Sequence, residues 1–130
     1  MATARGHIRI DRPAADVWQA ISEPTLIKDW FPGLSDCTTD GSGVRHVTTS
    51  NGMEVDEEIV TNDATLRRFQ YRLLPGPVPV EQHLATVDVI EDGSGTLVVY
   101  GVDVQPEAFG PAMQQTVDGA LAGLKAHVEG

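Results

Sequence analysis

The 130-residue sequence predicts an α+β fold in which a curved antiparallel sheet of six to seven strands wraps around one long helix. Two short helical segments follow the first strand, and a long stretch with the two-residue period of β-strands comes next. The segment from about 106 to 128 then carries an apolar seam at the spacing of one helix face. The seam consists of Phe109, Met113, Val117, Ala120, Leu121, Leu124 and Val128. Because the strands are the only large apolar partner for this seam, we expect the helix to lie across the sheet and to enclose a pocket.

The N-terminal part is predicted to contain one strand and two short helices. Residues 6–10 form the strand, with Ile8 and Ile10 on one face. Pro13 suits the first turn of a helix, where a missing N–H costs nothing. The buried stripe of this helix consists of Ala14, Val17, Trp18 and Ile21. Pro24 opens a second short helix, which ends at residues 31–33.

The middle of the chain alternates between polar and apolar residues, as half-buried strands do. Five further strands are predicted at about 44–49, 53–61, 67–74, 80–90 and 96–104. The motif Asp-Gly-Ser-Gly occurs at 40–43 and at 92–95, but neither copy opens a helix, so both are β-turns and not phosphate loops. No linker divides the chain, and we expect a single domain over residues 1–130.

Composition narrows the range of partners. The net charge is −10, from 9 basic and 19 acidic residues, which argues against nucleic acid and against anionic lipid surfaces. No segment approaches the length of a membrane span, so we expect no membrane insertion. The one cysteine, Cys37, has no base or second thiol beside it and is interpreted as a packed thiol. No signal peptide is visible, and a cytoplasmic location is the default expectation.

The hairpin around Asn51 has two plausible registers. A three-residue loop over 50–52 pairs Arg45 with Glu57 and leaves an almost wholly polar outer face. A two-residue loop instead places Val47 among the acidic residues, so we choose the first register. Arg45 and Glu57 are then opposite each other on the inward face, where a charge is costly unless paired. The pair is either a structural ion pair or a ligand anchor in which Glu57 serves as acid or base.

Three further polar side chains fall on apolar strand faces. His83 shares its face with a run of small apolar residues, Tyr71 lies between Phe69 and Leu73, and Tyr100 lies between two valines. Each is more often a satisfied core residue than a functional group, with a tyrosine hydroxyl tied to the backbone. Together they match an apolar pocket with a few convergent polar groups.

The order of elements and several short motifs resemble the SRPBCC superfamily of Bet v 1-like and START-related proteins, with its helix-grip fold. Within it, the chain resembles the bacterial polyketide cyclase/dehydrase and lipid transport proteins. The resemblance covers nearly the whole chain. It is carried by residues 10–13, 17–18, 30–33, 43–45, 52, 55, 57, 63, 68–71 and 77–79 and by the final helix. It implies a cavity between sheet and helix that holds an apolar small molecule.

The candidate site follows from these inward faces. His83 and Glu57 are the catalytic candidates. The predicted ligand-binding residues are Arg45, Phe69, Tyr71, Val87, Val98, Tyr100, Phe109, Met113, Val117, Trp30 and Phe31. Trp30, Phe31 and the proline-rich loop 75–79 are expected near the cavity mouth.

Three functions stay open on these residues. The first is binding or transport of an apolar ligand such as a lipid, polyketide or isoprenoid-like molecule by a monomer or homodimer. The second is a polyketide-type cyclase or dehydratase, and the third is a protein-binding module. No metal site is expected, because the four histidines lack ligand spacing, and no cofactor is expected, because no dinucleotide or phosphate motif occurs.

Overall fold

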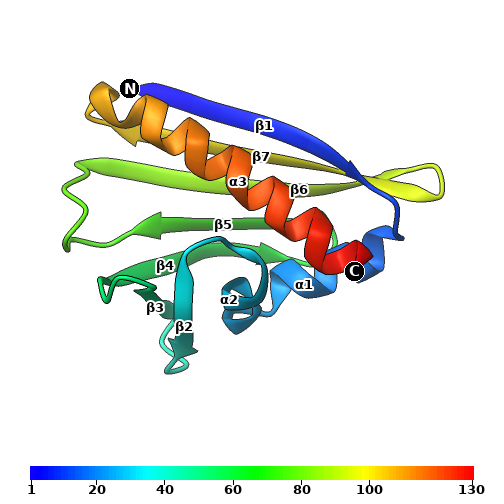
Figure 1. Cartoon of the computed structure of the whole chain (residues 1–130), viewed down its shortest axis with the longest axis horizontal. Helices are drawn as coiled ribbons and strands as arrows, with labels where there is room; N and C mark the ends of the chain where they lie inside the picture. The colour runs from blue at the N-terminus through cyan, green and yellow to red at the C-terminus, as the bar shows by residue number, and fades with distance from the viewer.

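The computed structural model describes all residues, 1–130, and contains one seven-stranded antiparallel sheet with three α-helices (Figure 1). The strand order is β1-β7-β6-β5-β4-β3-β2. The strands are β1 (Ala2–Ile10), β2 (Leu34–Thr39), β3 (Val44–Thr49), β4 (Glu54–Asp63), β5 (Arg68–Leu73), β6 (Gln82–Asp92) and β7 (Gly95–Gln105). The helices are α1 (Ala14–Ser22), α2 (Ile27–Trp30) and α3 (Gly110–Glu129), with 3-10 turns at Pro24–Leu26 and Glu107–Phe109. This is the predicted helix-grip architecture.

The long helix α3 lies along β1 and β7 on the inner face of the sheet (Figure 1). The middle of the predicted seam is buried, as expected: Val117, Ala120, Leu121 and Leu124 are 0 to 3% exposed. The helix begins at Gly110, a few residues later than predicted, because the backbone at Pro106 is extended and a 3-10 turn follows it. Phe109 and Met113 at its start are only partly buried.

The short helices α1 and α2 close one end of the space under α3. Ala14, Val17 and Ile21 of α1 are buried as predicted, whereas Trp18 is only partly buried and packs on the core. The helices α2 and α3 approach each other closely at Gly123. A Cβ on Gly123 of α3 would lie 2.1 Å from the carbonyl oxygen of Trp30, so this contact requires glycine.

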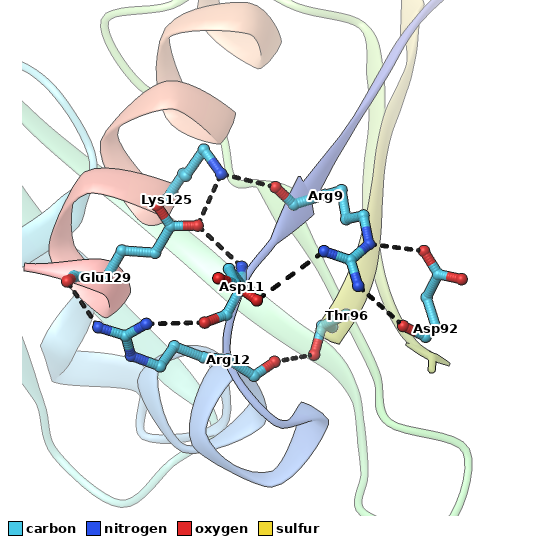
Figure 2. Close-up of polar contacts among 7 residues, drawn as sticks. All are labelled: Arg9, Asp11, Arg12, Asp92, Thr96, Lys125 and Glu129. Carbon is cyan, nitrogen blue, oxygen red and sulfur yellow. Dashed lines mark hydrogen bonds and ion pairs between the residues drawn. The ribbon is translucent and has the colours of Figure 1, made fainter. Parts of the chain in front are cut away.

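The same end of α3 is fastened to the rest of the molecule by polar contacts (Figure 2). The Glu129 carboxylate accepts hydrogen bonds from the Asp11 backbone N–H at 2.8 Å and from Lys125 Nζ at 2.6 Å. Its carbonyl oxygen accepts one from the Arg12 guanidinium at 2.8 Å. The donors from Asp11 and Lys125 hold the pKa of Glu129 below its usual value. The C-terminal turn of α3 is therefore fixed to the end of β1.

One strand, β2, is absent from the sequence prediction. It is the edge strand next to β3, its pairing contains a bulge between Leu34 and Asp36, and only Cys37 of its six residues is buried. A short, bulged, mostly polar edge strand lacks the apolar alternation on which the prediction depends. Cys37 is packed, and its Sγ lies 3.7 Å from the Pro24 carbonyl oxygen, as the interpretation of a packed thiol expects.

The predicted register of the β3–β4 hairpin is confirmed. Arg45 pairs with Glu57 and Val47 with Val55. Gly52 adopts a φ of 88°, the left-handed conformation that a three-residue loop requires at this position. The register places Arg45 and Glu57 on the inner face, toward α3.

Candidate functional site

A cavity of about 320 Å³ lies between the inner face of the sheet and the N-terminal half of α3. Each strand from β2 to β7 contributes to its wall. Twelve of the sixteen lining residues are hydrophobic, as in a site for an apolar small molecule. The lining consists of Phe31, Leu34, Val47, Thr49, Met53, Val55, Glu57, Tyr71, Leu73, Val78, His83, Val102, Phe109, Ala112, Met113 and Thr116.

The cavity occupies only one end of the space between sheet and helix. Six predicted site residues line it, namely Phe31, Glu57, Tyr71, His83, Phe109 and Met113. Seven do not line it and are buried in the packed core instead: Trp30, Arg45, Phe69, Val87, Val98, Tyr100 and Val117. Strand alternation predicts which face points inward, but it does not show where along the strand the space is filled. Here α1, α2 and the C-terminal half of α3 fill the other end.

Trp30 is the clearest correction. It is expected near the cavity mouth, but it is only 6% exposed and its indole Nε1 donates a hydrogen bond to the Ala20 carbonyl oxygen at 3.1 Å. The close contact of its own backbone with Gly123 holds α2 against α3. The next residue, Phe31, points differently and lines the cavity.

Arg45 and Glu57 form a buried ion pair at the boundary between core and cavity. Arg45 Nε donates to Glu57 Oε1 at 2.8 Å, and the two side chains are 2% and 10% exposed. The guanidinium also donates from Nη1 to the Pro24 carbonyl oxygen at 3.2 Å, and its Cζ lies 5.3 Å and 5.0 Å from the ring centroids of Phe69 and Tyr71. Nη2 is buried without a hydrogen-bond partner. The cation is thus held by one carboxylate, one carbonyl and two aromatic faces.

Only one oxygen of the Glu57 carboxylate is used by the protein. Oε1 accepts the bond from Arg45, whereas Oε2 accepts none, and Glu57 lines the cavity. Burial raises the pKa of Glu57, and the adjacent guanidinium opposes that rise. Because an arginine stays protonated, the carboxylate form of Glu57 is the one that keeps the buried pair neutral.

The hydroxyl groups of the two tyrosines hydrogen-bond to each other, which corrects the expectation that they bond to the backbone. Tyr71 lines the cavity, and Tyr100 lies behind it in the core. Burial raises the pKa of both phenols above the ordinary value for tyrosine. Both are therefore neutral near pH 7, and their mutual hydrogen bond uses one of the two hydroxyl protons.

His83 completes the wall where β5 and β6 separate. The pairing of these strands ends at Tyr71 and Ala85, and beyond that point the Leu73 backbone N–H donates to His83 Nδ1 at 3.1 Å. Burial lowers the pKa of His83 to about 4, so the ring is neutral near pH 7. With Nδ1 accepting a bond, the ring proton resides on Nε2. His83 is thus a weak base whose first role is to satisfy the backbone of β5.

Sequence reasoning missed the cavity residues Leu34, Ala112 and Thr116. It placed Leu73 and Val102 on inward strand faces and Val78 in the loop expected near the cavity mouth, but it did not include them in the site. It did place Val47, Thr49, Met53 and Val55 on the inward face of the hairpin, but it did not include them in the site. The hairpin register was the available signal, since it puts these side chains beside Glu57. Leu34 could not be found, because it belongs to the unpredicted strand β2.

No group of three or more His, Cys, Asp or Glu side chains is placed to hold a metal ion. No helix is long and apolar enough to cross a membrane. The ionisable side chains in the cavity wall are Glu57, His83 and Tyr71.

Solved structures with the same fold cover nearly the whole chain. XoxI from Bacillus cereus superposes with a TM-score of 0.90 at 23% identity, over 99% of this chain and 97% of that one. A protein from Thermobifida fusca superposes with a TM-score of 0.81 at 29% identity, over 99% and 92%. The di-domain ARO/CYC BexL of the BE-7585A biosynthetic pathway has a TM-score of 0.81 at 20% identity, over 99% of this chain and 47% of its own.

None of the curated proteins matches the sequence. The family model described as polyketide cyclase / dehydrase and lipid transport does match it, over residues 1–129. With the seven-stranded sheet, the long C-terminal helix and this match over almost its full length, the chain belongs to the polyketide cyclase/dehydrase and lipid transport family.

Proposed function

We propose that this protein binds an apolar small molecule in the cavity between the sheet and the N-terminal half of α3. The observation that carries the proposal is the cavity itself, with about 320 Å³ of space and twelve hydrophobic residues among its sixteen. This volume falls within the range of small-molecule sites, at its lower end. The family description, which names lipid transport, agrees with such a ligand.

The test is binding of N-phenyl-1-naphthylamine, a neutral apolar probe whose emission rises in apolar surroundings. Met113 lines the cavity from α3, so Met113→Trp fills space that the probe needs. We expect this change to weaken binding by at least about tenfold, equivalent to about 1.4 kcal/mol. Ala122→Trp is the matched control, because Ala122 lies on the exposed face of the same helix.

Circular dichroism on both variants checks that they fold. Equal probe affinity in the wild type and in a folded Met113→Trp variant would place the binding site elsewhere. Native mass spectrometry of the protein purified from its own host then identifies the bound molecule.

A second candidate function is a cyclase or dehydratase step on a similar ligand. The observation that favours it is the Glu57 carboxylate in a mostly apolar wall, where burial raises its pKa and the adjacent Arg45 opposes that rise. One structural relative, BexL, is described as an ARO/CYC protein. His83 is the weaker candidate, since its Nδ1 is occupied and its pKa is about 4. With a substrate in hand, undiminished turnover by Glu57→Gln would show that Glu57 is not the acid–base group.

The protein-binding alternative has less support. It calls for a contiguous exposed apolar patch. Only four large apolar side chains are exposed, Met1, Val60, Leu66 and Ile90, and none of them lines the cavity.

A further inference from the structure

We propose that the cavity selects neutral ligands that carry a hydroxyl or a similar hydrogen-bond donor, which bonds to the free oxygen of Glu57, and that it disfavours carboxylic acids. This inference rests on the proposed binding function and adds the polar part of the ligand to it. The polar groups in the wall differ in how many hydrogen-bond donors and acceptors they have left for a ligand.

The two threonines in the wall have already used their hydroxyl protons. Thr49 Oγ1 donates to the side-chain oxygen of Asn51 and accepts from the Met53 backbone N–H at 2.9 Å. Thr116 Oγ1 donates to the Ala112 carbonyl oxygen, one turn earlier in α3, at 3.0 Å. Neither side chain has a free proton for a ligand.

Tyr71 and His83 have also used part of their capacity. The Tyr71 hydroxyl is bonded to that of Tyr100. His83 Nδ1 accepts the Leu73 N–H, which leaves the ring one neutral donor, Nε2–H. His83 lies at the cavity edge, since it also lines a groove on the outer side with Arg72, Gln82 and Leu84.

Glu57 is different, because Oε2 accepts no bond from the protein and carries part of a negative charge. An O–H or N–H group of a ligand that reaches it forms a charge-assisted hydrogen bond, which is stronger than a neutral one. An apolar ligand without a donor instead leaves this oxygen desolvated and unpaired, which is unfavourable. The wall therefore favours a ligand with a hydrogen-bond donor over a ligand without one.

The position of Arg45 explains why the cavity disfavours a ligand carboxylate. Arg45 lies behind Glu57, against Phe69, Tyr71 and the Pro24 carbonyl, and it does not line the cavity. No lysine or other arginine lines the cavity either. A ligand carboxylate would therefore face the Glu57 carboxylate with no accessible cation to offset its charge.

The test compares three ligands that share one naphthalene body: 2-naphthol, 2-methylnaphthalene and 2-naphthoate. Each displaces N-phenyl-1-naphthylamine from the wild-type protein at pH 7, where the naphthol is neutral and the naphthoate is charged. We expect 2-naphthol to bind about tenfold more tightly than 2-methylnaphthalene. We expect 2-naphthoate to bind at least about tenfold more weakly than 2-methylnaphthalene.

Two variants assign the selection to Glu57. Glu57→Gln is expected to abolish the preference for 2-naphthol and to bring 2-naphthoate close to 2-methylnaphthalene. Glu58→Gln is the matched control, because Glu58 is the next residue in β4 and pairs with Arg72 outside the cavity at 2.8 Å. Removing both charges in Arg45→Met/Glu57→Gln repeats the test without a buried unpaired arginine, in case the single variant does not fold.

The outcomes separate this inference from the proposed function. If the probe and 2-methylnaphthalene bind but 2-naphthol is not preferred, or 2-naphthoate binds as well as 2-naphthol, the inference is wrong and the binding function stands. The inference is equally wrong if Glu57→Gln keeps the wild-type order of affinities, as Glu58→Gln is expected to do. If neither the probe nor any of the three ligands binds, both proposals fail.

Discussion

Arg45 has three nitrogens that can donate hydrogen bonds, and the fold gives oxygen partners to two of them, Nε and Nη1. The third, Nη2, is buried without one. What compensates for it is charge, because the Glu57 carboxylate and the faces of Phe69 and Tyr71 surround the guanidinium. The same arrangement explains why Glu57 can present an anionic oxygen to an apolar cavity: its counterion is supplied from behind, inside the core.

The buried His83 predicts how the stability of the fold changes with pH. Its pKa is about 4 in the folded protein against 6.5 for an ordinary histidine, because burial disfavours the charged ring. The unfolded chain therefore binds more protons between these values, and His83 stabilises the fold fully above pH 6.5 and loses that contribution as the pH falls toward 4. The full difference corresponds to about 3 kcal/mol.

The measurement is the free energy of unfolding by urea at several pH values, for the wild type and for His83→Gln. Glutamine can accept the Leu73 N–H but does not titrate, so the variant should lose less stability over this interval. Using the difference between the two proteins removes the contribution of His46, whose pKa is raised by its hydrogen bonds to Asp56 and Asp40. Identical pH dependence in both proteins would contradict the prediction.

At the scale of single residues, the sequence predicted which side chains face inward better than it predicted which of these side chains line the cavity. The alternation in β5, β6 and β7 correctly turned Tyr71, His83 and Tyr100 inward. It could not separate Tyr71, in the cavity wall, from Tyr100, in the packed core, because both are inward residues of paired strands. That distinction depends on which part of α1, α2 or α3 lies above each residue, which is a property of the assembled fold.

At the scale of elements, the contact between α2 and α3 depends on one glycine. A Cβ at Gly123 would lie 2.1 Å from the Trp30 carbonyl oxygen, a backbone atom that cannot move aside without shifting α2. We expect Gly123→Ala to destabilise the protein by about 1–3 kcal/mol, the usual range for overpacking. Thermal and urea unfolding measure the change.

Gly119→Ala is the matched control for this prediction. It lies one turn earlier on the same helix, and its Cβ would be 3.7 Å from Pro32, an ordinary contact. Alanine favours helix over glycine by about 1 kcal/mol, so this variant should be neutral or more stable. A Gly123→Ala variant as stable as Gly119→Ala would show that α2 does not pack on α3 as described.

The elements themselves differ in how well the sequence predicts them. α3 was predictable from its apolar seam, and the β3–β4 hairpin from the separation of acidic residues on one face and apolar residues on the other. β2 was not, because a bulged edge strand with one buried residue has no period to detect. Without β2, Leu34 could not be included in the predicted site.

At the scale of the whole molecule, the single helix α3 covers the packed core with its C-terminal half and the cavity with its N-terminal half. The C-terminal half of α3 packs on α1, α2 and the sheet, and Glu129 fastens its last turn to the end of β1 (Figure 2). The N-terminal half covers the cavity with Ala112, Met113 and Thr116. Packed contacts resist local opening, whereas a helix over a cavity has fewer of them. The two halves should therefore differ in stability although they belong to one continuous helix.

Hydrogen exchange followed by mass spectrometry tests this division. We expect backbone amides around Met113 to exchange faster than those around Leu121 and Leu124, because the latter side chains are at most 3% exposed in the core. Saturating N-phenyl-1-naphthylamine should slow exchange around Met113. A ligand that binds only while the helix is folded over the cavity stabilises that folded state by mass action. The region around Leu124 provides the internal control and should change little. Equal protection along all of α3, or slowing confined to its C-terminal half, would contradict the assignment of the cavity to the N-terminal half of the helix.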